Sequence, residues 1–214
     1  MTIVPHRSKL KTSEMLNAVA LAGWAILLLV YLVYFMSPLP AAWWWLTLAC
    51  ELICASEVAQ IVLGILRGRV ILGVALHGTR LIILTAVMPL PDIAPSLTTS
   101  LVLLAWATTE VSRYPMFLSD ALTVRKLRYA VPVLTFPVGA GGEAWLAWLA
   151  LDQISNPLLY VAVWLIIPSN VIGGATYAYP GIIKKAAGEV SGKYKRLEGE
   201  PRDAPPPRSR GTRC

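Results

Sequence analysis

Residues 136–143 combine the side chains best suited to build a reactive site. The segment reads Phe-Pro-Val-Gly-Ala-Gly-Gly-Glu. Phe136 and Glu143 are seven residues apart, so on a helix they share one face, about 10 Å apart along the axis. Glycines at three of the four positions 139–142 let another backbone or a thin substrate chain approach closely. Glu143 supplies a carboxylate that can transfer a proton. The segment predicts one wall of a site, and small-residue helix packing is the alternative interpretation.

Other polar and ionisable residues interrupt stretches that are otherwise apolar: Glu51, Glu57, Gln60, His77, Arg80, Glu110 and Arg113. An ionised residue near the centre of a bilayer costs about 2.5–3.5 kcal/mol on insertion scales. We therefore expect a polar interior surrounded by apolar faces, in which the two arginines hold an anionic substrate. Glu110 and Arg113, at i and i+3, can also satisfy each other, so ion pairing that only stabilises the protein is an alternative for any single residue.

The composition explains why that interior must lie in a membrane. The 214 residues are 56% hydrophobic and 14% charged, with a mean hydropathy of +0.61, whereas globular chains carry about 25% charged residues. A soluble enzyme, a disordered chain and a disulfide scaffold are therefore excluded. Cys50 and Cys54 are interpreted as small packing residues. We predict no metal site, and no dinucleotide-binding or phosphate-loop fingerprint indicates a cofactor.

Six apolar stretches are each long enough to cross a hydrocarbon core as a helix. They cover residues 15–36, 43–66, 70–90, 97–118, 129–151 and 157–183. The fold class is therefore predicted to be an all-α, six-helix transmembrane bundle. A basic N-terminus (residues 1–14) precedes this domain (residues 15–183), and a basic, Pro-rich, disordered tail (residues 184–214) follows it.

The positions of the basic residues predict the orientation. Of the 19 lysines and arginines, 3 precede the first stretch, 2 follow the second, 3 follow the fourth and 9 follow the sixth. The connections after the first, third and fifth stretches contain none, so both termini are predicted to be cytosolic. The net charge of +7 is then explained by topology and by contacts with anionic lipids, and no nucleic-acid partner is expected.

Several motifs occur in an order that resembles a known family. Residues 106–114 read WATTEVSRY, residues 127–129 read LRY and residues 136–143 read FPVGAGGE. They resemble the W-x-x-T-E-x-x-R-Y, L-R-Y and Y-P-x-G-x-x-x-E stretches of the membrane 3-hydroxyacyl-CoA dehydratases of very-long-chain fatty acid elongation, once called protein-tyrosine-phosphatase-like proteins. Upstream, Glu57 with Gln60, then residues 63–64 and 79–80, are similar to the family's L-E-x-x-H, L-G and S-R. The resemblance covers roughly residues 15–183.

The resemblance implies the removal of water from a 3-hydroxyacyl-CoA, giving the trans-2-enoyl-CoA, at the endoplasmic reticulum membrane. The family's catalytic glutamate corresponds to Glu143 and its catalytic tyrosine to Phe136. The residues that the resemblance makes candidates to line the substrate cavity, or to position Glu143, are Glu57, Arg80, Glu110, Arg113, Tyr114 and Gly139. The basic residues Arg125, Lys126 and Arg128 suit the phosphates of coenzyme A, or serve only as a topology signal.

Phe136 departs from the family pattern, because a phenyl ring can neither donate nor accept a proton. Loss of one proton-transfer partner typically lowers a rate by about 10²–10⁴. Three explanations remain: an engineered Tyr→Phe variant, a natural homologue with weakened or absent activity, or an enzyme that uses another hydroxyl. Gln60 at the family's histidine position is a second, milder departure.

Three functions are consistent with these observations. The first is the elongation dehydratase, with long-chain 3-hydroxyacyl-CoA as substrate and membrane lipids and other elongation enzymes as partners. The second is a non-catalytic homologue that binds acyl chains or acts as a scaffold. The third is a small transporter, although the sequence has no visible inverted repeat. A tyrosine phosphatase is disfavoured, because no cysteine precedes an arginine in a phosphate-cradling loop.

Overall fold

The computed structural model describes residues 7–64, 69–118 and 121–190, and within these ranges every regular element is a helix, without strands. The elements in chain order are α1 (Arg7–Val33), α2 (Ala41–Val62), α3 (Val70–Ile82), η1 (Ile83–Val87), α4 (Leu97–Arg113), α5 (Pro115–Leu118), α6 (Leu122–Ala150), η2 (Leu151–Gln153), α7 (Pro157–Pro168), η3 (Ser169–Ala178) and α8 (Tyr179–Val190). The segments η1 and η3 are π-helical and continue α3 and α7.

Each of the six predicted apolar stretches is helical, with boundaries that differ in places. Helix α6 begins at Leu122, so Arg125, Lys126 and Arg128 lie in its first two turns and not in a loop. Helix α8 ends at Val190, which corrects the prediction of a disordered tail for residues 184–190. Residues 191–214 of the predicted tail lie outside the described residues.

Within the described residues, four helical stretches are long and apolar enough to cross a membrane: Met15–Val33, Ala41–Val62, Val70–Val87 and Pro157–Glu189. They indicate a membrane protein. Helix α4 is shorter, at 17 residues, and α6 contains Pro132, Pro137 and Glu143, which reduce its apolar character. The arrangement with six spans and cytosolic termini stays a prediction.

Side-chain caps determine where two of the helices begin. The Ser96 side chain accepts a hydrogen bond from the Thr99 backbone N–H at 3.1 Å, so α4 starts at Leu97. The Asn156 side chain accepts hydrogen bonds from the backbone N–H groups of Leu158 and Leu159, and Pro157 follows it at the first helical position. These caps satisfy backbone donors that a helix end leaves free.

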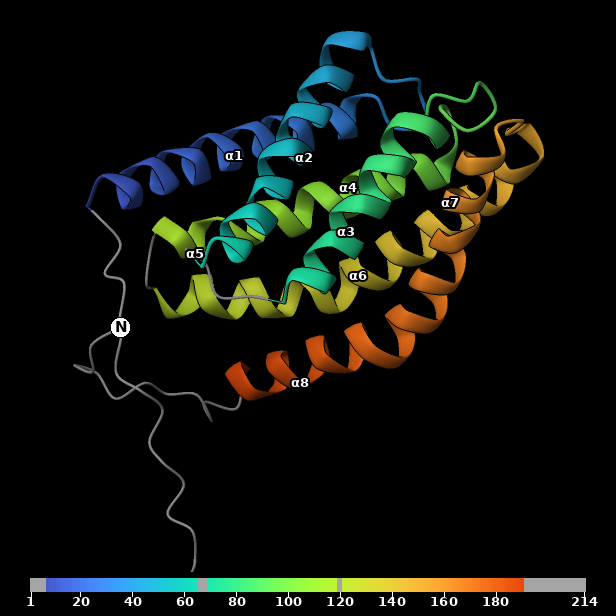
Figure 1. Ribbon diagram of the computed structural model, residues 1–214. Coiled ribbons are helices and arrows are strands. Elements are labelled where there is room, and N and C mark those ends of the chain that lie inside the picture. The colour runs from blue at the N-terminus through green and yellow to red at the C-terminus, as the bar shows by residue number, and fades with distance from the viewer. Residues whose placement is uncertain (1–6, 65–68, 119–120, 191–214) are drawn as a thin grey trace, which may run out of the picture.

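Helix α4 lies at the centre of the bundle, where it packs against α1 and α6, and α6 in turn packs against α7 and α8 (Figure 1). In the same view, the first turn of α1, the start of α6 and the end of α8 lie toward one end of the bundle. The connections between α1 and α2 and between α6 and α7 lie toward the other end. Trp24, Trp106 and Tyr114 are among the largest side chains that the packing buries completely.

The contact between α4 and α6 depends on a glycine. A Cβ atom added to Gly142 would lie 2.4 Å from Val102 Cγ2, whereas one added to the neighbouring Gly141 would meet nothing within 4 Å. The two helices can therefore approach closely at Gly142 because it has no side chain.

We expect Gly142→Ala to destabilise the protein, because overpacking of a tight contact typically costs about 1–3 kcal/mol. Thermal unfolding in detergent should show a clearly lower midpoint for this variant. Gly141→Ala is the matched control, one residue away on the same helix, and should not lower the midpoint, because its Cβ meets no neighbour and alanine favours the helix. Equal midpoints for the two variants would contradict the close contact.

Candidate functional site

A chain of buried charged groups connects α2, α3 and α4. Arg80 lies at its centre, with Nη1 2.7 Å from Glu110 Oε1 and 3.4 Å from Glu51 Oε2. The other oxygen of Glu51 lies 2.7 Å from His77 Nδ1. All four residues are at most 5% exposed. Buried charges are tolerated only when they are paired in this way, so these contacts fix the positions of three helices.

The same chain continues from α4 to the end of α2. Arg113 Nη2 lies 2.9 Å from Glu110 Oε2 and 2.9 Å from Glu57 Oε1, so the expected i,i+3 pair on α4 is formed. The Tyr114 hydroxyl donates to Glu57 Oε1 at 3.0 Å and lies 3.1 Å from Cys54 Sγ. We call the set His77, Glu51, Arg80, Glu110, Arg113, Glu57 and Tyr114 the charge network.

Glu143 lies outside the charge network, and neutral groups hold its carboxylate. The side chain is buried, with 4% of its surface exposed. Its Oε1 accepts a hydrogen bond from the Trp106 indole N–H at 2.8 Å, and its Oε2 accepts one from Asn170 Nδ2 at 3.0 Å. Two neutral donors fix the orientation of the carboxylate and leave its charge without a direct cationic partner.

Trp106 connects Glu143 to the charge network. The guanidinium carbon of Arg80 lies 5.2 Å from the centre of the Trp106 ring, a cation–π distance. The edge of the same ring donates to Glu143. Gly139, one turn before Glu143, faces this tryptophan, because a Cβ added there would lie 3.8 Å from Trp106 Cδ1. The network therefore positions Glu143 indirectly, through one side chain.

A cavity of about 790 Å³ lies between α3 and η3. Glu143 does not line it and is reached from it through Asn170. Phe136 and Asn170 line it, and Asn170 is the residue that contacts the Glu143 carboxylate. Arg69, which immediately precedes α3, and Thr79, near the end of α3, line it as well. Ten residues of helix separate these two positions by about 15 Å along the axis. The cavity therefore leads from the start of α3 to the vicinity of Glu143.

Exposed side chains form part of the cavity wall. Ile71 is 83% exposed and Tyr177 is 62% exposed. At the start of α3, Arg69 Nη1 donates to the Tyr177 hydroxyl at 2.9 Å, so the basic end of the cavity joins α3 to η3. A long apolar chain can enter from the side, and an anionic group can lie near Arg69.

Phe136 forms part of the wall of this cavity. Its ring stacks on Tyr179, with the two centroids 6.1 Å apart and the planes 9° from parallel. The Tyr179 hydroxyl donates to the backbone carbonyl of Val133 at 3.1 Å. Tyr179 is thus a hydroxyl-bearing neighbour of Phe136, and its hydroxyl is hydrogen-bonded to the backbone.

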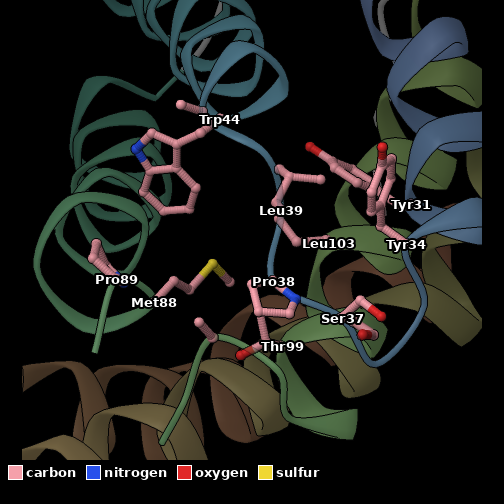
Figure 2. Close-up of a pocket in the computed structure, with 13 residues that line it drawn as sticks. Tyr31, Tyr34, Ser37, Pro38, Leu39, Trp44, Met88, Pro89, Thr99 and Leu103 are labelled. Atoms are coloured by element: carbon pink, nitrogen blue, oxygen red, sulfur yellow. The ribbon is translucent and has the colours of Figure 1, made fainter. Parts of the chain in front are cut away.

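A second cavity, of about 340 Å³, lies among α1, α2, the segment after η1 and α4. Tyr31 of α1 and Tyr34, just after α1, line one side of it, and Trp44 and Met88 lie across from them (Figure 2). Among the described residues that line it, none has a carboxylate or a basic side chain, and none is a hydrogen-bond partner of Glu143. The larger cavity includes such a partner, Asn170, so proton transfer to a substrate is better supported there.

The structure brings the candidate residues into two connected groups. Glu57, Arg80, Glu110, Arg113 and Tyr114 belong to the charge network and mainly contact one another. Glu143, Phe136 and Gly139 lie along α6, close to Trp106 or to the large cavity. The roles of these residues in binding and catalysis stay predictions.

Sequence reasoning did not assign three residues that complete the arrangement. Glu51 is one of the ionisable residues of the apolar stretches, but its place between Arg80 and His77 depends on how α2 packs on α3. Trp106 opens the WATTEVSRY motif without an obvious partner. Asn170 lies next to Ser169 in the last apolar stretch, and the only signal that the sequence offered for it was a polar side chain in an apolar segment.

The comparisons with known proteins identify a family. A family model described as "Protein tyrosine phosphatase-like protein, PTPLA" matches residues 51–179, which include every member of the charge network, Phe136, Glu143 and Asn170. Neither the curated proteins nor the solved structures contain a significant match.

We expect Arg80→Met to be strongly destabilising, because it leaves Glu51 and Glu110 buried without their shared cation. Breaking a buried ion pair from one side typically costs about 3–5 kcal/mol. Arg125→Met is the matched control. Arg125 pairs with Glu189 at 2.8 Å, but its side chain is 28% exposed, and such pairs contribute about 0–1 kcal/mol. Similar thermal unfolding midpoints in detergent for the two variants would refute the importance of the network.

Proposed function

Because this chain belongs to the family of the very-long-chain 3-hydroxyacyl-CoA dehydratases, we propose that it removes water from a long-chain 3-hydroxyacyl-CoA to give the trans-2-enoyl-CoA. The observation that carries this proposal is the buried Glu143 carboxylate, which is held by Trp106 and by Asn170, a residue of the wall of the large cavity. We place the reaction in very-long-chain fatty acid elongation, at the endoplasmic reticulum membrane.

Glu143 is the group that takes the proton from C2 of the substrate. A carboxylate suits this role when it is positioned and shielded from water. Both of its oxygens accept hydrogen bonds from neutral donors, and a carboxylate can accept further contacts on each oxygen. The carboxylates of the charge network instead have arginine or histidine partners within 3.4 Å, which makes them poorer proton acceptors.

The large cavity fits an acyl thioester in both shape and polarity. Apolar side chains of α3 and η3 line most of its length, and Arg69 lies at the end predicted to face the cytosol. The hydrocarbon chain would enter from the lipid, and the phosphates of coenzyme A would remain near the cytosolic surface. Arg128 and Lys185, which line a separate hollow of about 170 Å³ at the start of α6, offer further positive charge there.

Phe136 is the reason to expect a low rate of dehydration. Loss of the C3 hydroxyl as water requires a proton, and Phe136 lines the cavity at the position where the family has a hydroxyl. The reaction is therefore expected to be slow in this chain. The same observation favours the second candidate function, a non-catalytic homologue that binds long-chain acyl thioesters or supports the other elongation enzymes.

The same proposal includes the orientation in the membrane. The start of α1 and the end of α8 lie toward one end of the bundle (Figure 1), which agrees with termini on the same side. We propose that this side is the cytosol and that all six apolar helical stretches cross the membrane, with α4 and α6 shielded by their neighbours.

We expect Phe136→Tyr to raise the rate of dehydration by about 10²-fold or more, since it restores a proton-transfer group. The measurement is conversion of a long-chain 3-hydroxyacyl-CoA by purified protein in detergent or vesicles. Phe136→Leu, which remains apolar, is the matched control and should give no gain. Glu143→Gln in the Phe136→Tyr background should abolish the gain, because the amide cannot accept the C2 proton.

If Phe136→Tyr has no activity although the folded protein binds long-chain acyl-CoA, the catalytic proposal fails and the non-catalytic function is favoured. If the chain neither turns over nor binds these thioesters, both functions fail.

We expect Cys214 to react with a membrane-impermeant maleimide from the cytosolic side of sealed vesicles. A cysteine introduced by Ser155→Cys, between η2 and α7, should react only after the membrane is permeabilised. The reverse pattern would show that the proposed orientation is wrong.

A further inference from the structure

Asn170 is placed between the Glu143 carboxylate and the large cavity. It belongs to the π-helical segment η3, and its side chain both contacts Glu143 Oε2 and lines the cavity wall. π-helical turns within α-helices are frequent at functional sites, because the wider turn re-aims side chains. Phe136 lines the same cavity, so the amide and the phenyl ring face the same space.

The Asn170 carboxamide has hydrogen-bonding capacity to spare. A carboxamide has two N–H donors and one carbonyl acceptor. In the described part of the chain, the bond to Glu143 at 3.0 Å is the hydrogen bond that this side chain makes. The second N–H and Oδ1 are therefore available to a molecule in the cavity.

Other polar side chains along the cavity are less suited to this place. The Thr79 hydroxyl donates to the backbone carbonyl of Leu76 at 3.0 Å. Arg69 and Tyr177 bond to each other at the start of α3. Asn170 is the cavity-lining residue within hydrogen-bond distance of the Glu143 carboxylate in the described structure.

The dehydration reaction requires a hydrogen-bond donor at the thioester oxygen, and Asn170 is placed to be that donor. When the C2–H bond breaks, the proton moves to Glu143 and the electron pair forms an enolate whose charge lies on the thioester oxygen. The C3–O bond then breaks, the C2–C3 double bond forms, and the departing hydroxide takes a proton and leaves as water. Because Phe136 supplies no proton, Glu143 must give the proton taken from C2 to the departing hydroxide. Until that transfer is complete, the negative charge on the enolate oxygen needs a hydrogen-bond donor to stabilise it.

We propose that Asn170 is that donor: one N–H of its carboxamide holds Glu143, and the other binds the thioester carbonyl oxygen of the substrate. One amide group then sets the carbonyl and the base side by side, which brings the carbon next to the carbonyl within reach of Glu143. This inference rests on the proposed dehydratase function and adds to it a substrate-contacting residue.

The experiment separates enolate formation from loss of water. A saturated long-chain acyl-CoA has no C3 hydroxyl, so the protein can only exchange its C2 protons with solvent. In D₂O, the C2–H bond breaks, Glu143 takes the proton, and a deuteron returns to C2. Mass spectrometry of the recovered thioester measures this exchange in the protein as it stands, without a residue 136 hydroxyl.

We expect Asn170→Ala to slow the exchange by about 10²-fold, the typical effect of removing one donor from a developing oxyanion. Asn170→Leu, of similar size but without hydrogen-bond donors, should be at least as slow. Thr176→Ala is the matched control: it removes a polar side chain from the same π-helical segment, at an exposed site whose hydroxyl bonds to Ile172 O. This control should exchange at the native rate.

The same substitutions in the Phe136→Tyr background distinguish the two possible failures. If Phe136→Tyr dehydrates the substrate and Asn170→Ala lowers neither the exchange nor kcat, the role of Asn170 is refuted while the dehydratase function stands. If neither background exchanges or dehydrates, the dehydratase function itself fails. Equal thermal unfolding midpoints for Asn170→Leu and the native protein would assign a slower exchange to lost donors and not to lost structure.

Discussion

The need to pair Arg80 inside a membrane bundle constrains the rest of the structure. A buried guanidinium is tolerated only with close carboxylate partners, and Arg80 finds them on two different helices, in Glu51 and Glu110. These ion pairs join α2, α3 and α4. The ring of Trp106 then lies against the Arg80 guanidinium as a cation–π contact. The position of the Glu143 carboxylate then follows, because the edge of that ring donates to it.

This arrangement divides the buried carboxylates into two kinds. Glu51, Glu57 and Glu110 each lie close to a basic side chain, and their charge contributes mainly to cohesion of the bundle. Glu143 has neutral donors on both oxygens and lies next to a cavity through Asn170. The hydrogen-bond partners of each buried glutamate thus indicate whether it stabilises the bundle or is suited to proton transfer.

The helices beside the cavity are suited to approach by a long, thin molecule. Helix α6 carries glycines where it meets α4, and Gly142 allows contact with Val102. The last helical stretch changes from α-helix to π-helix after Pro168, which directs Asn170 toward Glu143 and leaves Gly173 and Gly174 in the cavity wall. Close packing on one side of α6 and an open wall on the other place the carboxylate at the boundary between core and cavity.

The sequence by itself determined the helices and the membrane setting, because hydropathy is a local property and each backbone group in lipid must form its hydrogen bond within its own segment. It also indicated the family, through several short motifs in a fixed order. It also placed Phe136 and Glu143 on one face and paired Glu110 with Arg113, since these relations span only one or two helical turns. Helix ends were less predictable, because basic residues such as Arg125 continue a helix beyond its apolar part. Only the tertiary structure decided that Arg80 pairs with Glu51, that Trp106 orients Glu143, and that Asn170 connects the carboxylate to the cavity wall. These contacts join residues 27 to 37 positions apart, and the packing of whole helices, which no local pattern specifies, brings them together.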